Sequence, residues 1–171
     1  ATRGLHHDGA ADLGDAWGAS AEGERFWLIL KDSRIGAFGV MSLWLCLSGQ
    51  LILAEELYAR RAWGALVFAP CAGRTAAVLL AWLARDLARP GLGGSFLRGA
   101  EPGRVVLAGL AAGALGLLLA PAALPLTILL LAPGLVFLRR LGRRQGGLNG
   151  DFLGAAIVYG ELCAGAAALL T

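Results

Sequence analysis

The sequence has few charged residues, and no long polar stretch separates one apolar run from the next. Charged residues make up 16% of the 171 residues and hydrophobic residues 57%, whereas a soluble domain carries roughly 25% charged residues. Mean hydropathy is +0.67. This composition excludes an ordinary soluble globular domain and predicts an all-α fold, a polytopic bundle of membrane helices. Because the net charge is only +3, we expect no nucleic-acid partner.

Cysteine is also scarce. The three cysteines, Cys46, Cys71 and Cys163, lie in or beside apolar segments and lack the close spacing of a metal site. We therefore interpret them as small apolar packing residues. Glycine, by contrast, is abundant at 26 residues, as expected where membrane helices approach one another closely.

Five apolar segments approach the ~20 residues that cross a bilayer core. They span residues 35–57, 62–83, 105–120, 122–138 and 152–170. The third and fourth are near the short limit and are joined by a tight reversal, so a re-entrant hairpin is an alternative to two spans. We expect one membrane domain over residues 1–171. Residues 1–34 would form a cytoplasmic acidic motif and an interfacial helix, and residues 35–171 the transmembrane helices and their loops.

Basic residues collect at one end of these segments. If each segment crosses once, residues 1–34 and the loops 85–104 and 139–151 share one side of the membrane. That side carries Arg3, Arg25, Lys31, Arg34, Arg85, Arg89, Arg98, Arg104, Arg139, Arg140, Arg143 and Arg144, and the other carries only Arg60 and Arg61. The positive-inside rule places the first side in the cytoplasm. Five of the six aspartates share it, and we expect the sixth, Asp86, to be partnered by a neighbouring arginine.

The densest polar cluster is the acidic motif, in which Asp8, Asp12 and Asp15 fall within eight residues. On a helix, Asp12 lies about 40° from Asp8, and Asp15 about 20° away on the other side. Three carboxylates on one face repel each other and require a cation, and oxygen ligands favour Mg²⁺. Gly9 leaves room for a ligand beside the backbone. The motif predicts a metal-diphosphate site, although an acidic, solvated helix end has the same composition.

A second cluster precedes the first apolar segment. Asp32 or Ser33 can cap the helix that follows, and the positive end of that helix would face the same pocket as the acidic motif. Lys31 and Arg34 flank this helix start as phosphate donors. A basic membrane anchor with an ordinary cap is the alternative interpretation.

Two more features involve the last apolar segment. Glycines precede Asp151, which can hold a hydrated ion or cap the helix that it begins. Glu161 lies about three turns deeper, where a carboxylate is costly unless it is paired or faces a cavity. Arg74, similarly placed in the second segment, is either the partner of Glu161 or a phosphate ligand.

The chain resembles the cobalamin-5′-phosphate synthases, also named adenosylcobinamide-GDP ribazoletransferases. The resemblance rests on Gly4–Asp12, Lys31–Val40 and Gly146–Ala155, in that order, with Arg74 and Arg89–Gly93 also fitting. Members of the family usually carry further N-terminal hydrophobic segments, so the resemblance implies an N-terminally truncated family domain.

The sequence departs from the family pattern at several positions. His7 and Ala10 stand where leucine is usual, Asn149 where threonine is usual, and Val158 where an acidic residue is common. The aspartates of the acidic motif, Asp32 and Asp151 are all retained, so the resemblance implies that the chemistry is preserved.

The resemblance implies a Mg²⁺-dependent transferase of the bacterial cytoplasmic (inner) membrane, with its active site on the cytoplasmic face. A hydroxyl of α-ribazole, or of its 5′-phosphate, would attack the cobinamide-linked phosphorus of adenosylcobinamide-GDP, and GMP would leave. Membrane lipid is a further expected partner, and a homo-oligomer is left open.

Each candidate residue then has an expected role. The metal ligands would be Asp8, Asp12, Asp15 and Asp151. The substrate contacts would come from Lys31, Arg34, Arg74, Gly9 and Asn149. The residue that takes the hydroxyl proton would be Asp15, Asp32 or His6, and the residues alone do not rank these three.

Two other classes of protein share part of this pattern. Another membrane Mg²⁺-diphosphate transferase, such as a CDP-alcohol phosphotransferase or a prenyltransferase, would use the same physics. The first class expects an arginine where Asp12 stands, and the second expects two aspartate-rich repeats. A transporter is the other alternative, but it should show inverted repeats with paired broken helices, and we find no convincing internal repeat.

Overall fold

The computed structural model describes residues 4–171, so Arg3 of the predicted cytoplasmic charge lies outside the described residues. Within this range the chain forms eight α-helices, one short 3₁₀-helix and no β-strand, which confirms the predicted all-α class. The α-helices are α1 (Leu5–Gly18), α2 (Gly23–Leu30), α3 (Ala37–Ala59), α4 (Trp63–Leu83), α5 (Leu92–Arg98), α6 (Pro102–Leu119), α7 (Ala123–Arg144) and α8 (Gly150–Leu170). The 3₁₀-helix η1 (Arg85–Leu87) follows α4.

Five of the helices, α3, α4, α6, α7 and α8, are long and apolar enough to cross a membrane. They coincide with the five predicted segments. The shortest, α6, has 18 residues and is therefore roughly 27 Å long, close to the ~30 Å of a bilayer core. Helix α7 continues beyond the predicted end at residue 138 to Arg144. Each of these two helices is long enough to span, so the fold does not require the re-entrant alternative.

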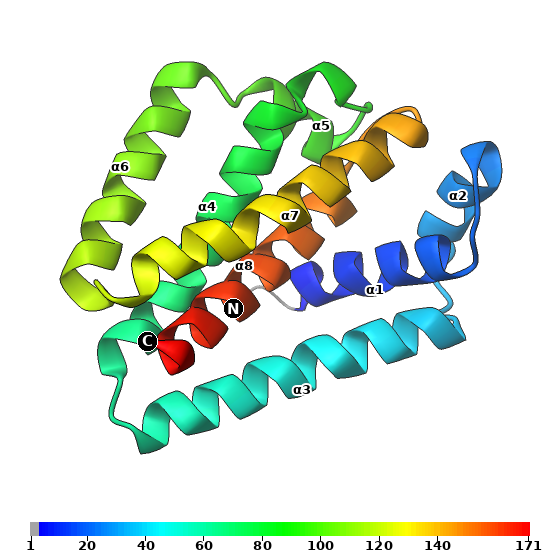
Figure 1. The fold of residues 1–171 in the computed structure, drawn as a ribbon. Helices are drawn as coiled ribbons and strands as arrows, with labels where there is room; N and C mark the ends of the chain where they lie inside the picture. Colours follow the sequence, from blue (N-terminus) through cyan, green and yellow to red (C-terminus); the bar gives the residue numbers. More distant parts are fainter. Residues whose placement is uncertain (1–3) are drawn as a thin grey trace.

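Helix α8 is the centre of the bundle. It packs against α4, α1, α7 and α3, and Figure 1 shows it between α1 and α3 on one side and α4 and α6 on the other. Small residues allow these contacts, because a Cβ added to Gly160 of α8 would lie 2.8 Å from the Cα of Gly73 in α4. Close backbone approach through glycine is the packing mode that the composition predicted.

The end of α7 holds α2 in place. Gln145, directly after α7, is buried. Its backbone carbonyl accepts a hydrogen bond from Trp27 Nε1 at 2.8 Å, and its side-chain oxygen accepts one from the Gly23 N–H at 3.0 Å. The Arg89 guanidinium lies 3.9 Å from the centre of the Trp27 ring, a cation–π contact. The segment predicted to be an interfacial helix is therefore α2, fixed against the protein through its apolar face.

Candidate functional site

An acidic cleft of about 830 Å³ opens between α1, the α2–α3 connection and the first half of α3. Its polar lining includes Asp8 and Asp12 of α1, and Lys31 and Asp32 of the connection. Apolar side chains of α3, Leu43 and Leu47, form the wall toward the membrane-spanning part. The structure thus brings together four predicted site residues that come from two separate motifs.

The carboxylates of α1 repel one another. The pKa of Asp12 is raised from 3.8 to about 6, first by burial and then by the negative charges of Asp8, Asp151 and Asp15. Asp8 itself is exposed at the mouth of the cleft. A carboxylate that is hard to ionise beside others is a position where a cation lowers the energy of the site.

Asp15 has a role that differs from the predicted one. Its carboxylate is 8% exposed and accepts hydrogen bonds from the backbone N–H of Gly36 and of Gly39, each at 2.7 Å. It therefore caps the N-terminus of α3 from a different helix. The expected caps, Asp32 and Ser33, do not cap this helix, because α3 begins after Gly36. Because Asp15 is buried, caps α3 and does not line the acidic cleft, we expect it to be neither a metal ligand nor the acceptor of the hydroxyl proton.

Asp32 forms a bidentate pair with Arg34. The Arg34 Nε and Nη2 atoms lie 3.0 and 2.8 Å from the two carboxylate oxygens, and this pairing lowers the pKa of Asp32 to about 2. Asp32 is thus ionised near neutral pH and is a weak proton acceptor. The Arg34 side chain is 85% exposed and is not part of the cleft lining, which differs from its expected contact with substrate.

Asp151 lies beside α1, next to Gly9. A Cβ added to Gly9 would lie 2.8 Å from the Asp151 Cα, so the backbone of α8 fills the space that we expected a ligand to use. Asn149 caps α8 by accepting a hydrogen bond from the Asp151 N–H at 3.2 Å. Its amide also donates to Asp151 Oδ2 at 2.6 Å. Gly9 and Asn149 therefore position α1 and Asp151, and the structure shows no direct opening for substrate at Gly9.

A polar network links α1, α3, α4 and α8. Arg74 Nη1 pairs with Glu161 Oε1, which confirms the first of the two interpretations of Arg74. Gln50 Nε2 donates to Glu161 Oε2 at 2.6 Å, and Gln50 Oε1 lies 2.6 Å from His7 Nε2. Glu161, as a carboxylate, only accepts hydrogen bonds. Gln50 must therefore turn its NH₂ group toward Glu161 and its side-chain oxygen toward His7.

His6 belongs to the surroundings of this network and does not line the acidic cleft. Burial lowers the pKa of His6, and the positive charge of Arg74 lowers it further. Of the three candidates for taking the hydroxyl proton, only Asp32 lines the cleft. The patterns in the sequence did not identify Gln50, because a single polar residue in an apolar segment gives no sign of its partners.

The arrangement of the carboxylates decides how the cleft could hold Mg²⁺. Within residues 4–171, no group of three or more His, Cys, Asp or Glu side chains is arranged to hold a metal ion. A cage of four aspartates is therefore not formed. Mg²⁺, however, is commonly held by one or two carboxylates together with substrate phosphates and water. The mutual repulsion at Asp12 and the oxygen-only donors fit that second arrangement, with Asp8 and Asp12 as the protein ligands.

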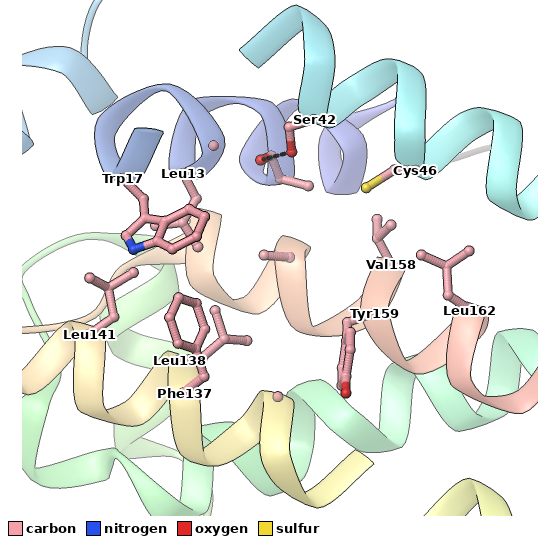
Figure 2. Close-up of a pocket in the computed structure, with 14 residues that line it drawn as sticks. Leu13, Trp17, Ser42, Cys46, Phe137, Leu138, Leu141, Val158, Tyr159 and Leu162 are labelled. Carbon is pink, nitrogen blue, oxygen red and sulfur yellow. Dashed lines mark hydrogen bonds between the residues drawn. The ribbon is translucent and has the colours of Figure 1, made fainter. Parts of the chain in front are cut away.

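A separate apolar cavity of about 290 Å³ lies on the opposite face of α1. Figure 2 shows its lining, with the Trp17 ring edge-on to Phe137 and with Tyr159 from α8 on the far side. Its lining residues include no Asp, Glu, Lys or Arg. It lacks charged groups for diphosphate chemistry, so the acidic cleft is the candidate functional site.

Comparison with known proteins agrees with the order of the motifs. A model of the family described as cobalamin-5-phosphate synthase matches residues 1–169. The chain belongs to this family. No solved structure matches it.

Three curated relatives show how much of the family's length is present. All are named adenosylcobinamide-GDP ribazoletransferase. The protein from Nitratidesulfovibrio vulgaris Miyazaki F is 51% identical over 96% of this chain and 66% of its own length. The protein from the Hildenborough strain is 51% identical over 91% of this chain and 64% of its own length. The protein from Novosphingobium aromaticivorans is 39% identical over 91% of this chain and 61% of its own length. The chain thus spans just under two thirds of the length of these relatives.

Proposed function

We propose that the protein is a membrane transferase that joins α-ribazole, or its 5′-phosphate, to adenosylcobinamide-GDP and releases GMP. One observation carries the proposal. Asp8 and Asp12 of one family motif share a single cleft with Lys31 and Asp32 of another. The cleft combines anionic groups for a cation with a cationic group for phosphate, which is what transfer at a diphosphate requires. The names of the relatives supply the substrates.

A Mg²⁺ ion held by Asp8 and Asp12 would neutralise charge on the diphosphate and on the leaving GMP. Asp12 is half-buried and Asp8 exposed, so the pair presents oxygens toward the open cleft. Asp151 adds negative charge behind them, and its bonds to Asn149 hold it in place. The arrangement is supported by the raised pKa of Asp12.

Lys31 and Asp32 would act on the substrates directly. The ammonium of Lys31, at the end of α2, would hold phosphate oxygens as a point charge. The Asp32 carboxylate, kept ionised by Arg34, would accept a hydrogen bond from the attacking hydroxyl and orient it toward phosphorus. Because a carboxyl with a pKa of about 2 is a poor base, Asp32 would orient the hydroxyl rather than remove its proton. The proton would pass to the departing GMP phosphate or to water as the new O–P bond forms and the bond to GMP breaks.

We further propose that the protein forms one domain in the bacterial inner membrane, with the cleft on the cytoplasmic face. The support is the charge distribution, since twelve of the fifteen Lys and Arg residues lie within residues 1–34, 85–104 and 139–144, which share one side of the membrane under the predicted topology. The cleft lies at the start of α3, at the same end of the molecule under the predicted topology.

The test measures GMP release from adenosylcobinamide-GDP as a function of Mg²⁺ concentration. We expect Asp8→Asn and Asp12→Asn to lower the rate roughly 10²-fold or more and to raise the Mg²⁺ concentration for half-maximal activity. Glu24→Gln removes an exposed carboxylate of α2 outside the cleft and serves as the matched control. Wild-type rates and Mg²⁺ dependence in both aspartate variants would contradict the proposal.

A further inference from the structure

A second polar hollow lies where α4 ends and α7 approaches its last turn. It has a volume of about 350 Å³ and is lined by Trp82, Leu83, Arg85, Asp86 and Arg139. None of these residues lines the acidic cleft. The hollow is large enough for a small ligand, and three charged groups face it from two different parts of the chain.

The charged groups of this hollow form no ion pair within residues 4–171, and one nitrogen, Arg139 Nε, is both shielded and unpartnered. Arg139 Nε is shielded from solvent and has no hydrogen-bond partner among the described residues. The ion pairs formed by residues 4–171 involve neither Arg85 nor Asp86 nor Arg139. Asp86 is therefore not partnered by a neighbouring arginine as predicted, and Arg89 stacks on Trp27 instead. A buried guanidinium N–H without an acceptor is costly, so an acceptor from outside the protein would stabilise it.

The position of the hollow indicates where that acceptor comes from. Both α4 and α7 are long enough and apolar enough to span a membrane, and the hollow lies at the ends of both. Trp82, 40% exposed, is the residue type that membrane interfaces favour. A ligand in this hollow therefore lies at the depth of the lipid headgroups.

We propose that this hollow binds a membrane phospholipid whose headgroup carries both a phosphate and a primary amine. The Arg85 and Arg139 guanidinium groups would hold the phosphate through charge-assisted hydrogen bonds. Asp86 would accept from the ammonium group, and Trp82 would pack against the glycerol and the upper acyl chain. A phosphoethanolamine headgroup matches all three charges, whereas Asp86 repels a purely anionic headgroup and a choline headgroup offers it no N–H donor.

The experiment measures the Tm of the purified protein in detergent with added phosphatidylethanolamine, phosphatidylcholine or free phosphoethanolamine. We expect phosphatidylethanolamine to raise the Tm by roughly 3–5 °C for each tenfold excess over its Kd. The gain should be lost in Arg85→Gln/Arg139→Gln. It should be retained in the control Arg140→Gln/Arg143→Gln, which changes two exposed arginines of α7 that do not line the hollow.

Two results would overturn the proposal in this assay. One is an equal gain in the wild type and in Arg85→Gln/Arg139→Gln. The other is an equal gain with free phosphoethanolamine, because the source would then be a soluble phosphate rather than a lipid. No transferase substrate is present, so the outcome is independent of the proposed reaction.

If Arg85→Gln/Arg139→Gln does not fold, Asp86→Asn keeps both arginines and tests the amine contact alone. Native mass spectrometry of the protein with mixed lipids should show that phosphatidylethanolamine is retained over phosphatidylcholine in the wild type. The preference should be lost in Asp86→Asn. An unchanged preference, or none in the wild type, would also overturn the proposal.

Discussion

Replacing Asp15 tests whether this aspartate supports the fold rather than the chemistry. The Asp15 carboxylate accepts two backbone N–H groups of α3 at 2.7 Å each and is 8% exposed. In Asp15→Asn, one oxygen becomes an NH₂ group that faces a backbone donor. A lost cap costs about 0.5–2 kcal/mol, and a hydrogen bond to a charged group contributes about 1.5–3 kcal/mol. We therefore expect a loss of about 3 kcal/mol, which lowers the Tm by roughly 6–12 °C.

Thermal unfolding of Asp15→Asn and Asp8→Asn, run side by side, checks this expectation. Asp8 lies on the same helix but is exposed in the cleft, and its charge opposes ionisation of Asp12. Asp8→Asn should therefore keep the Tm or raise it slightly while GMP release falls. If Asp15→Asn unfolds at the wild-type temperature, Asp15 is not a cap of α3 and belongs with the cleft carboxylates.

Three other perturbations have expected outcomes. Glu161→Gln leaves the Arg74 charge without its partner. Because Arg74 is 46% exposed, the change should lower the free energy of unfolding by about 1–2 kcal/mol, with partial recovery when Arg74→Met is added. An unchanged Tm would mean that water or lipid solvates Arg74. In the presence of a metal chelator, the free energy of unfolding should fall as the pH rises from 4 to 6. The pKa of Asp12 is raised from 3.8 to about 6 in the fold, so the folded state binds more protons than the unfolded state in that window; denaturation curves of Asp12→Asn should lack this slope. Gly9→Ala should destabilise by about 1–3 kcal/mol as the new methyl meets the α8 backbone, whereas Gly103→Ala, with nothing within 4 Å, should not destabilise.

The helices could be predicted because their signal is local. Length and hydropathy located five spans, and the ends of α3, α4, α6 and α8 lie within three residues of the expected bounds. Helix α7 is the exception, because the sequence predicts a loop from Arg139 onward, where its four arginines lie. Arginine has a high helix propensity, so the helix continues through Arg144.

The site could be predicted only in part. Helical spacing correctly placed the acidic motif on one helix, α1. It did not show that Asp15, one turn beyond Asp12, meets another helix. The Asp15 cap joins residues 21 and 24 positions apart, and such a contact depends on the packing of α1 against α3. Likewise, the cost of a membrane carboxylate predicted a partner for Glu161, whereas the role of Gln50 depends on how α3 lies against α8.

The ion pair between Arg74 and Glu161 has a consequence for biogenesis. The two residues are 87 positions apart, and Glu161 lies in the last helix. At roughly 5–20 residues per second, the ribosome makes Glu161 about 4–17 s after Arg74. During that interval the arginine of α4 lacks its native counter-ion, and a charged side chain without a partner is costly in the bilayer core. The α4–α8 pairing, which lies at the centre of the bundle, can therefore be completed only after α8 has been made.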